Sequence, residues 1–320
     1  MSKLIKGLLG GVLLAASHFS LAQESGTLTW IVPYGPGGGT DVVARMLAEP
    51  MGEGLGRHIV VDNRAGGGTI IGVSALARAR PDGGTVGTVG TSQLTVLPYI
   101  QADLPFDAEK GFSYVGGIGI YPWVLMVNSK VPVNNLRELI ELAKSKPEGL
   151  SYGIPNAKGN ALLSMTRFQE AAGIELLAVP YRGEAPAIQD LLAGQIDMYL
   201  GNPIVMLPHV KSGMLRPLAV GRMDRLPFMP DVPTFDEEGL KGLETYEWQV
   251  LAAPAGTPPE TISRLNAELN KVLKDEKLVK KLADMGVEPF PTTPDAIYEL
   301  VKRDSEVHEP LIERLGLKDD

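Results

Sequence analysis

The chain has 320 residues, with 38 acidic and 30 basic side chains and no cysteine. The acidic balance disfavours nucleic acid and anionic membrane surfaces as partners, and the lack of thiols excludes disulfides, thiolate metal sites and a lipid anchor on cysteine. A hydrophobic content of 44% supports buried cores, and the length is typical of about two domains.

Residues 1–22 have the three-part pattern of a secretory signal peptide. Two lysines open it, a short apolar run follows, and a small-x-small cleavage motif ends at Ala22. A membrane anchor is the alternative, but the apolar run is too short to cross a bilayer about 30 Å thick. We therefore expect cleavage near Ala22-Gln23 and a mature protein in the periplasm.

Strand-like and helix-like segments alternate in the first half of the mature chain. Pro50 is expected to bend or end the first helix, because proline lacks the N–H group of a helix interior. The alternation predicts a mainly parallel sheet covered by helices. Strands are predicted at 28–33, 59–62, 85–91, 114–117 and 123–128, and helices at 41–55 and 69–80.

The second half repeats this alternation. Asn135 and Glu138 have the spacing of a capping box, and Thr257 is expected to cap the helix that begins at Pro259. Strands are predicted at 150–154, 177–180, 196–200, 215–220 and 248–253. Helices are predicted at 135–145, 160–172, 185–193, 203–212, 259–274, 276–285 and 294–315.

The two halves resemble each other, which predicts two α/β lobes. Val32-Pro33-Tyr34 and Val179-Pro180-Tyr181 each end a strand before a loop and a helix. The first lobe is expected to contain 23–124 and 246–320, and the second 125–245. Two strands that cross between the lobes would form a hinge, and a ligand cleft would lie between the carboxyl ends of the strands.

The glycine-rich loop 34–41 is the strongest candidate for ligand contact. Glycine lets the backbone approach a ligand closely, and the start of the next helix favours an anion. The loop lacks the lysine of a P-loop and the spacing of a dinucleotide loop, and a tight turn without a ligand is the alternative. The predicted contacts are Tyr34, Pro36, Gly37, Gly38, Gly39, Thr40 and Asp41.

Further candidates lie after other strands. Lys158 could offset the charge of a ligand carboxylate, or it could be a solvated surface lysine. Arg182 could make a bidentate contact with a ligand carboxylate, or it could form an ion pair on the protein surface. Thr91, Ser92 and Asn202 could supply hydroxyl and amide donors. The predicted contacts in these segments are Thr91, Ser92, Pro155, Asn156, Lys158, Asn160, Tyr181, Arg182 and Asn202.

Catalytic motifs are missing from the sequence. The mature chain has three histidines, His58, His209 and His308, and none lies in an HxxxH or HExxH pattern. The sequence has no GxSxG nucleophile motif. We therefore expect neither an enzyme nor a bound metal or cofactor.

Several long segments resemble the periplasmic solute-binding receptors of the tripartite tricarboxylate transporter family, also called Bug proteins. They include IVPYGPGGGTDVVARMLAEPM, VVDNRAGGGTIIG, VPYRGEAPAIQDLLAGQID and LAAPAGTPPETISRLNAELNKVL. The resemblance implies a two-lobe periplasmic-binding-protein fold that closes at a hinge. It also implies a small carboxylate ligand held by loops 34–41 and 154–160, partly through ordered water, and delivery to a membrane permease with a large and a small subunit. We expect a monomer.

Two departures from the family pattern bear on the ligand. Residues 155–159 replace a usual Gly-Asn-Gly-Ser pattern, and Gly201 stands where the family often has aspartate. A lost carboxylate and a gained Lys158 predict a di- or tricarboxylate or an aromatic acid rather than an amino acid. A sensory receptor that presents its ligand to a membrane kinase is the alternative function. A secreted hydrolase would need a nucleophile–base pair, and none is apparent in the sequence.

Overall fold

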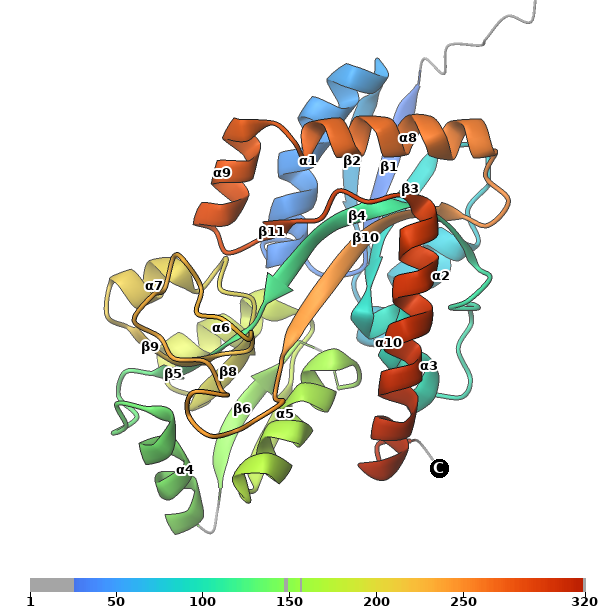
Figure 1. Cartoon of the computed structure of the whole chain (residues 1–320). Helices are drawn as coiled ribbons and strands as arrows, with labels where there is room; N and C mark the ends of the chain where they lie inside the picture. Colours follow the sequence, from blue (N-terminus) through green and yellow to red (C-terminus); the bar gives the residue numbers. More distant parts are fainter. Residues whose placement is uncertain (1–25, 147–148, 156, 319–320) are drawn as a thin grey trace, which may run out of the picture.

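The computed structural model describes residues 26–146, 149–155 and 157–318. The predicted signal peptide, its cleavage site and Asn156 lie outside these residues. The chain forms two sheets with helices on both faces, and Figure 1 shows them as an upper and a lower lobe joined by long crossing strands. We call the layers around the six-stranded sheet the first lobe and those around the five-stranded sheet the second lobe.

The first lobe has a sheet of order β11-β4-β10-β3-β1-β2. Strands β1 to β4 run in one direction, while β10 is antiparallel to both of its neighbours and β11 is antiparallel to β4. The sheet is therefore mixed rather than mainly parallel as predicted, because the returning strand β10 lies between β3 and β4 and runs against both. The strands are β1 (Thr27–Val32), β2 (His58–Asn63), β3 (Thr85–Gly90), β4 (Phe112–Pro122), β10 (Tyr246–Pro254) and β11 (Glu288–Pro289).

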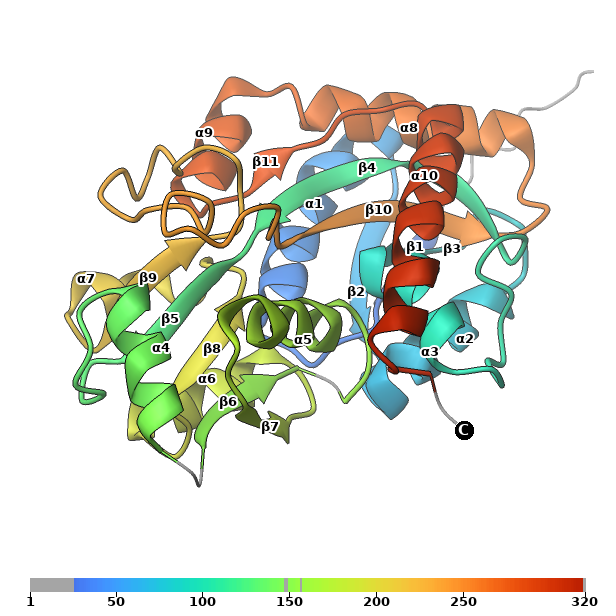
Figure 2. The same cartoon turned by 60° about the horizontal axis from the view of Figure 1, so that its bottom comes forward.

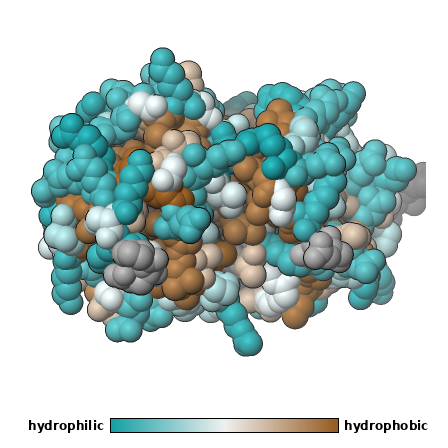
Figure 3. All heavy atoms as spheres, turned by 90° about the horizontal axis from the view of Figure 1, so that it is seen from below, coloured by the Kyte–Doolittle hydropathy of each residue, from teal (hydrophilic) through white to brown (hydrophobic). Residues whose placement is uncertain are grey.

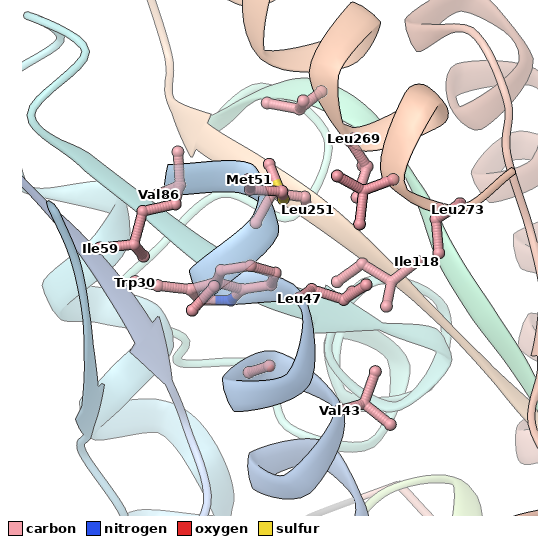
Figure 4. Close-up of a cluster of buried hydrophobic side chains, with 14 of the residues drawn as sticks. Trp30, Val43, Leu47, Met51, Ile59, Val86, Ile118, Leu251, Leu269 and Leu273 are labelled. Carbon is pink, nitrogen blue, oxygen red and sulfur yellow. The ribbon is translucent and has the colours of Figure 1, made fainter. Parts of the chain in front are cut away.

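Helices cover both faces of this sheet because successive side chains along its strands are apolar and point to opposite faces. Trp30 of β1 packs with Leu47 and Met51 of α1 on one face, and Ile31 packs with Leu76 on the other. Figure 4 shows the first of these clusters. The first face carries α1 (Gly39–Leu55), α8 (Pro259–Val272) and α9 (Glu276–Asp284). The second carries η1 (Gly67–Thr69), α2 (Ile70–Ala77), the π-helical turn η2 (Ser92–Val96), α3 (Leu97–Ile100) and α10 (Pro294–Arg314).

The second lobe has a sheet of order β7-β6-β8-β5-β9, in which only β5 runs against the others. Helices α4 and α5 pack on one face and α6 and α7 on the other. The strands are β5 (Val124–Asn128), β6 (Leu150–Ile154), β7 (Leu176–Pro180), β8 (Met198–Gly201) and β9 (Leu215–Val220). The helices are α4 (Leu136–Ser145), α5 (Asn160–Ala172), α6 (Glu184–Ala193) and α7 (Leu207–Lys211).

The lobes are joined where β4 continues through Trp123 into β5 and where the chain returns into β10 (Figure 2). Backbone hydrogen bonds tie the two crossings together. Trp123 N donates to Thr245 O at 3.0 Å, Gly221 N to Trp123 O at 2.8 Å and Thr245 N to Gly221 O at 3.0 Å. This small network is the candidate hinge. The lobe boundaries proposed from the sequence lie next to it and stay a prediction.

Several local predictions were wrong. The helix predicted at 203–212 is the shorter α7, the strand predicted at 114–117 is the longer β4, and α3 and β11 were not predicted. Pro50 does not end helix α1, which continues to the predicted Leu55, since the burial of Met51 and Leu55 outweighs the lost hydrogen bond. The bend expected at Pro50 stays a prediction. Thr257 does not cap α8, because its hydroxyl donates to Pro254 O at 2.8 Å. The strand predicted at 85–91 ends at Gly90, and the chain turns at once into η2.

Other features agree with the sequence. Asn135 caps α4, with Glu138 N donating to its Oδ1 at 2.9 Å. No helix in the described part of the chain combines the length and the apolar character that a membrane crossing requires. Seen from below, the molecule presents hydrophilic side chains around its rim and hydrophobic ones among them near the middle (Figure 3).

Candidate ligand-binding site

A small cavity of about 60 Å³ lies between the lobes. The first lobe contributes the loop after β1, the start of α1, and strands β4 and β10. The second lobe contributes the starts of α5 and α6 and the end of β8. Because both lobes wall it, the cavity is enclosed only while the lobes lie close together.

The glycine-rich loop reaches this cavity with its second half. Gly37 has a positive φ of 85°, which suits a residue without Cβ, and its N–H donates to Asp41 Oδ2 at 2.9 Å. Burial opposes ionisation of Asp41, but hydrogen bonds from Arg45, Gly37 and Asn63 prevail and lower the pKa of its carboxyl. Asp41 therefore stabilises the conformation of the loop without lining the cavity itself.

The start of α1 meets an acidic side chain of the opposite lobe. Gly39 N donates to Glu184 Oε2 at 2.9 Å, and a Cβ on Gly38 would lie 3.6 Å from Glu184. A helix N-terminus favours an anion, so this contact stabilises the ionised carboxylate. Burial outweighs that effect and raises the pKa of Glu184 to about 7.

A second acidic side chain enters the cavity from β10. Glu247 is 7% exposed, and its Oε2 accepts a hydrogen bond from Ser92 Oγ at 3.2 Å. Its Oε1 is buried and has no partner among the described residues. Burial raises the pKa of this carboxyl to about 7, and the nearby charge of Glu184 adds to the shift.

Neutral polar groups complete the wall. Gln249 Nε2 donates to Thr40 Oγ1 at 2.7 Å, and Tyr34 Oη accepts from Gln93 Nε2 at 2.9 Å. Gln249 Oε1 and the Tyr121 hydroxyl are buried without a partner in the described structure. Burial raises the pKa of Tyr34 and Tyr121 above the ordinary range, so their hydroxyls stay protonated and can donate.

Six of the predicted contact residues line the cavity, and one more supports it. The supporting residue is Ser92, which contacts Glu247 and accepts a hydrogen bond from Asn160 N at 3.2 Å. The residues that line the cavity are Tyr34, Gly38, Gly39, Thr40, Pro155 and Asn202. The predicted residues outside its lining are Pro36, Gly37, Asp41, Thr91, Ser92, Lys158, Asn160, Tyr181 and Arg182, while Asn156 lies outside the described residues.

The two predicted cations do not reach the cavity. Lys158 Nζ lies 3.0 Å from Gln101 Oε1, and Arg182 is exposed to solvent. Tyr181 beside it donates to Asp190 Oδ2 at 2.8 Å. Of the described residues that line the cavity, none is lysine, arginine or histidine. The charge argument for a di- or tricarboxylate therefore loses its structural basis.

Nine lining residues were not among the predicted contacts: Tyr121, Trp123, Ala161, Glu184, Tyr199, Leu200, Gly201, Glu247 and Gln249. Glu184 follows directly on the Arg182-Gly183 pair, so it lies at the loop that the sequence had indicated. Glu247 and Gln249 are polar residues on one face of an otherwise apolar strand, which is a signal that the sequence does carry. Gly201 also lines the cavity, and a Cβ there would lie 2.3 Å from the Tyr199 ring, so Tyr199 occupies the space of any side chain at 201.

No group of three or more His, Asp or Glu side chains in the described ranges is placed to hold a metal ion. The chemistry that this arrangement supports is reversible binding by hydrogen bonds and charge inside a closed cleft.

Comparison with known proteins identifies the class of receptor. The model of the family described as "Tripartite tricarboxylate transporter family receptor" matches residues 43–317, and the chain belongs to this family of periplasmic binding receptors. Protein BugT of Bordetella pertussis is 35% identical over 266 residues, which cover 83% of this chain and 82% of BugT.

Two solved structures of the same fold carry ligands. Rpa4515 of R. palustris, described with adipate, has a TM-score of 0.89 and 31% identity and covers 92% of this chain and 98% of its own. MatC of Rhodopseudomonas palustris, described with bound malate, has a TM-score of 0.84 and 27% identity and covers 90% of this chain and 99% of its own. These likenesses agree with the two-lobe fold predicted from the sequence.

Proposed function

We propose that the protein captures a small organic acid in the periplasm and delivers it to a secondary transporter of the tripartite tricarboxylate type. The observation that carries the proposal is the cavity that both lobes wall at the start of α1. The adipate described with Rpa4515 and the malate described with MatC support a carboxylate as the ligand. We propose a monomeric receptor and a permease with a large and a small subunit.

Neutral donors are available to a ligand carboxylate. The Tyr34 hydroxyl accepts from Gln93 Nε2 and is also hydrogen-bonded with Ser92, and the Tyr121 hydroxyl has no partner in the described structure. Asn202 accepts from Ile204 N through its Oδ1, which leaves its amide N–H groups for a ligand. Closure removes the ligand from bulk water, so each of these hydrogen bonds contributes more than it would at an open surface.

Closure is the step that a permease can recognise. A ligand that contacts both lobes stabilises the closed form because it binds the closed form more tightly than the open form. The tied crossings at Trp123, Gly221 and Thr245 give the lobes a short pivot for this motion.

Titration calorimetry of the purified mature protein with a panel of small mono-, di- and tricarboxylates, aromatic acids and amino acids tests the proposal. We expect saturable one-to-one binding of at least one acid, together with a rise in melting temperature. Binding of none of these acids, with neutral sugars or inorganic anions bound instead, would contradict the proposed function.

A further inference from the structure

We propose that the ligand carries a protonated amine in addition to a carboxylate, and that Glu247 and Glu184 receive this amine from opposite walls of the cavity. The inference rests on the proposed function and adds a substrate class to it: an amino acid or a related amphoteric acid. It reverses the expectation drawn from Gly201 and Lys158, because the acidic partner of an ammonium group is present at other positions.

The charges of the cavity favour a cation. Its two charged lining residues within the described structure are Glu184 and Glu247, one from each lobe. A ligand with carboxylates alone would bring further negative charge against both of them in a poorly solvated space. An ammonium group placed between them would offset their mutual repulsion as the lobes close.

The unpartnered atoms of the cavity also favour a donor. Glu247 Oε1 and Gln249 Oε1 are buried acceptors without partners in the part of the chain described. Both residues are at least nine-tenths buried, at 7% and 6% exposure. A buried acceptor left without a hydrogen bond is costly. An ionised ligand carboxylate only accepts, so it cannot satisfy the Gln249 amide oxygen or the ionised form of Glu247. An ammonium group offers three donors.

The anion site at the start of α1 is already taken by this chain. Gly39 N donates to Glu184, so the helix N-terminus holds a carboxylate that belongs to the protein. The ligand carboxylate would instead meet the neutral donors of Tyr34, Tyr121 and Asn202. The ligand amine would lie toward Glu184 and Glu247, which gives the cavity a donor side and an acceptor side.

Acidic pH separates the two kinds of ligand. Both glutamates titrate near neutral pH, and the other ionisable groups that face them are the tyrosines Tyr34, Tyr121 and Tyr199, which stay neutral. An ammonium ligand needs ionised glutamates, so its affinity should fall as the pH drops below about 7. A ligand with carboxylates alone binds better to protonated glutamates, so its affinity should rise over the same range.

The experiment is calorimetry near pH 8 with pairs of acids that differ only by an amino group: succinate and aspartate, glutarate and glutamate, adipate and 2-aminoadipate, propionate and β-alanine. We expect at least one amino acid to bind about 10- to 100-fold more tightly than its partner, since a charge-assisted hydrogen bond is lost without the amine. Equal or tighter binding of every amine-free partner would overturn the inference and leave the proposed function intact. Binding of neither set, with another carboxylate of the wider panel bound, would overturn the inference alone. Binding of no acid in either experiment would overturn the proposed function, and the inference with it.

Substitutions assign the effect to these two side chains. Glu247→Gln and Glu184→Gln keep the shape of the side chain and remove the charge, and we expect each to weaken the amino acid about 10-fold or more while the amine-free partner binds unchanged or better. Glu299→Gln, on the exposed face of α10, is the matched control and should change neither. Equal loss for both partners of a pair would contradict the assignment, provided that the melting temperature shows a folded variant.

Discussion

At the residue scale, Gly38 tests where the ligand lies. Substitution Gly38→Val adds two methyl groups beyond a Cβ that would already lie 3.6 Å from Glu184, so the lobes could not close on a ligand. We expect loss of binding in calorimetry with an unchanged far-UV spectrum and melting temperature. Gly26→Val, where no atom lies within 4 Å of the added Cβ, is the control. Full affinity of Gly38→Val would show that the ligand lies elsewhere.

The buried carboxyl of Glu247 predicts how stability depends on pH. Its pKa is raised to about 7 from 4.5 by burial, so the folded protein binds more protons than the unfolded chain between these values. The stability linked to this group is present below about pH 4.5 and is lost as the pH rises to 7. We expect the ligand-free wild type to lose on the order of 1–3 kcal/mol more than Glu247→Gln between about pH 5 and 8, measured by urea unfolding. An equal loss of unfolding free energy in the wild type and in Glu247→Gln would disprove the raised pKa of Glu247.

Single residues were the hardest part to predict. The loop of Tyr34 and Gly38 was found because glycine, a preceding strand and a following helix are local signals. Lys158 was proposed because of its charge, yet its ammonium group contacts Gln101. The direction of a side chain depends on how the lobes pack, and a local pattern does not contain that information.

At the element scale, the crossing segments depend on a close backbone approach. A Cβ on Gly221 would lie 1.9 Å from Thr245 Oγ1 and 2.4 Å from Thr245 O, so Gly221→Ala forces the two crossings apart. We expect a loss of about 1–3 kcal/mol in the free energy of unfolding, from denaturant titration, and weaker ligand binding. Gly26→Ala should change neither quantity. Wild-type stability and affinity of Gly221→Ala would mean that these hydrogen bonds do not form the pivot.

Element boundaries were predicted most accurately where the local sequence signal was strong. The capping box at Asn135 predicted the start of α4, and the apolar spacing predicted α5 with its observed bounds. Thr257 failed as a cap because its hydroxyl bonds to Pro254 O. Pro50 failed as a helix end because packing of α1 against the first sheet prevails.

At the scale of the whole molecule, the alternation of strands and helices was enough to predict two lobes and two crossings. It did not predict the acidic cavity, because Glu184 and Glu247 are 63 positions apart (247 − 184) and meet only when the lobes face each other. A structure of the mature protein purified from its host, with the ligand that it has captured, tests the central claim most directly. We predict a small organic acid enclosed between the lobes in contact with the 34–41 loop and β10. A ligand bound outside this cavity, or a closed form whose cavity is filled by side chains alone, would contradict it.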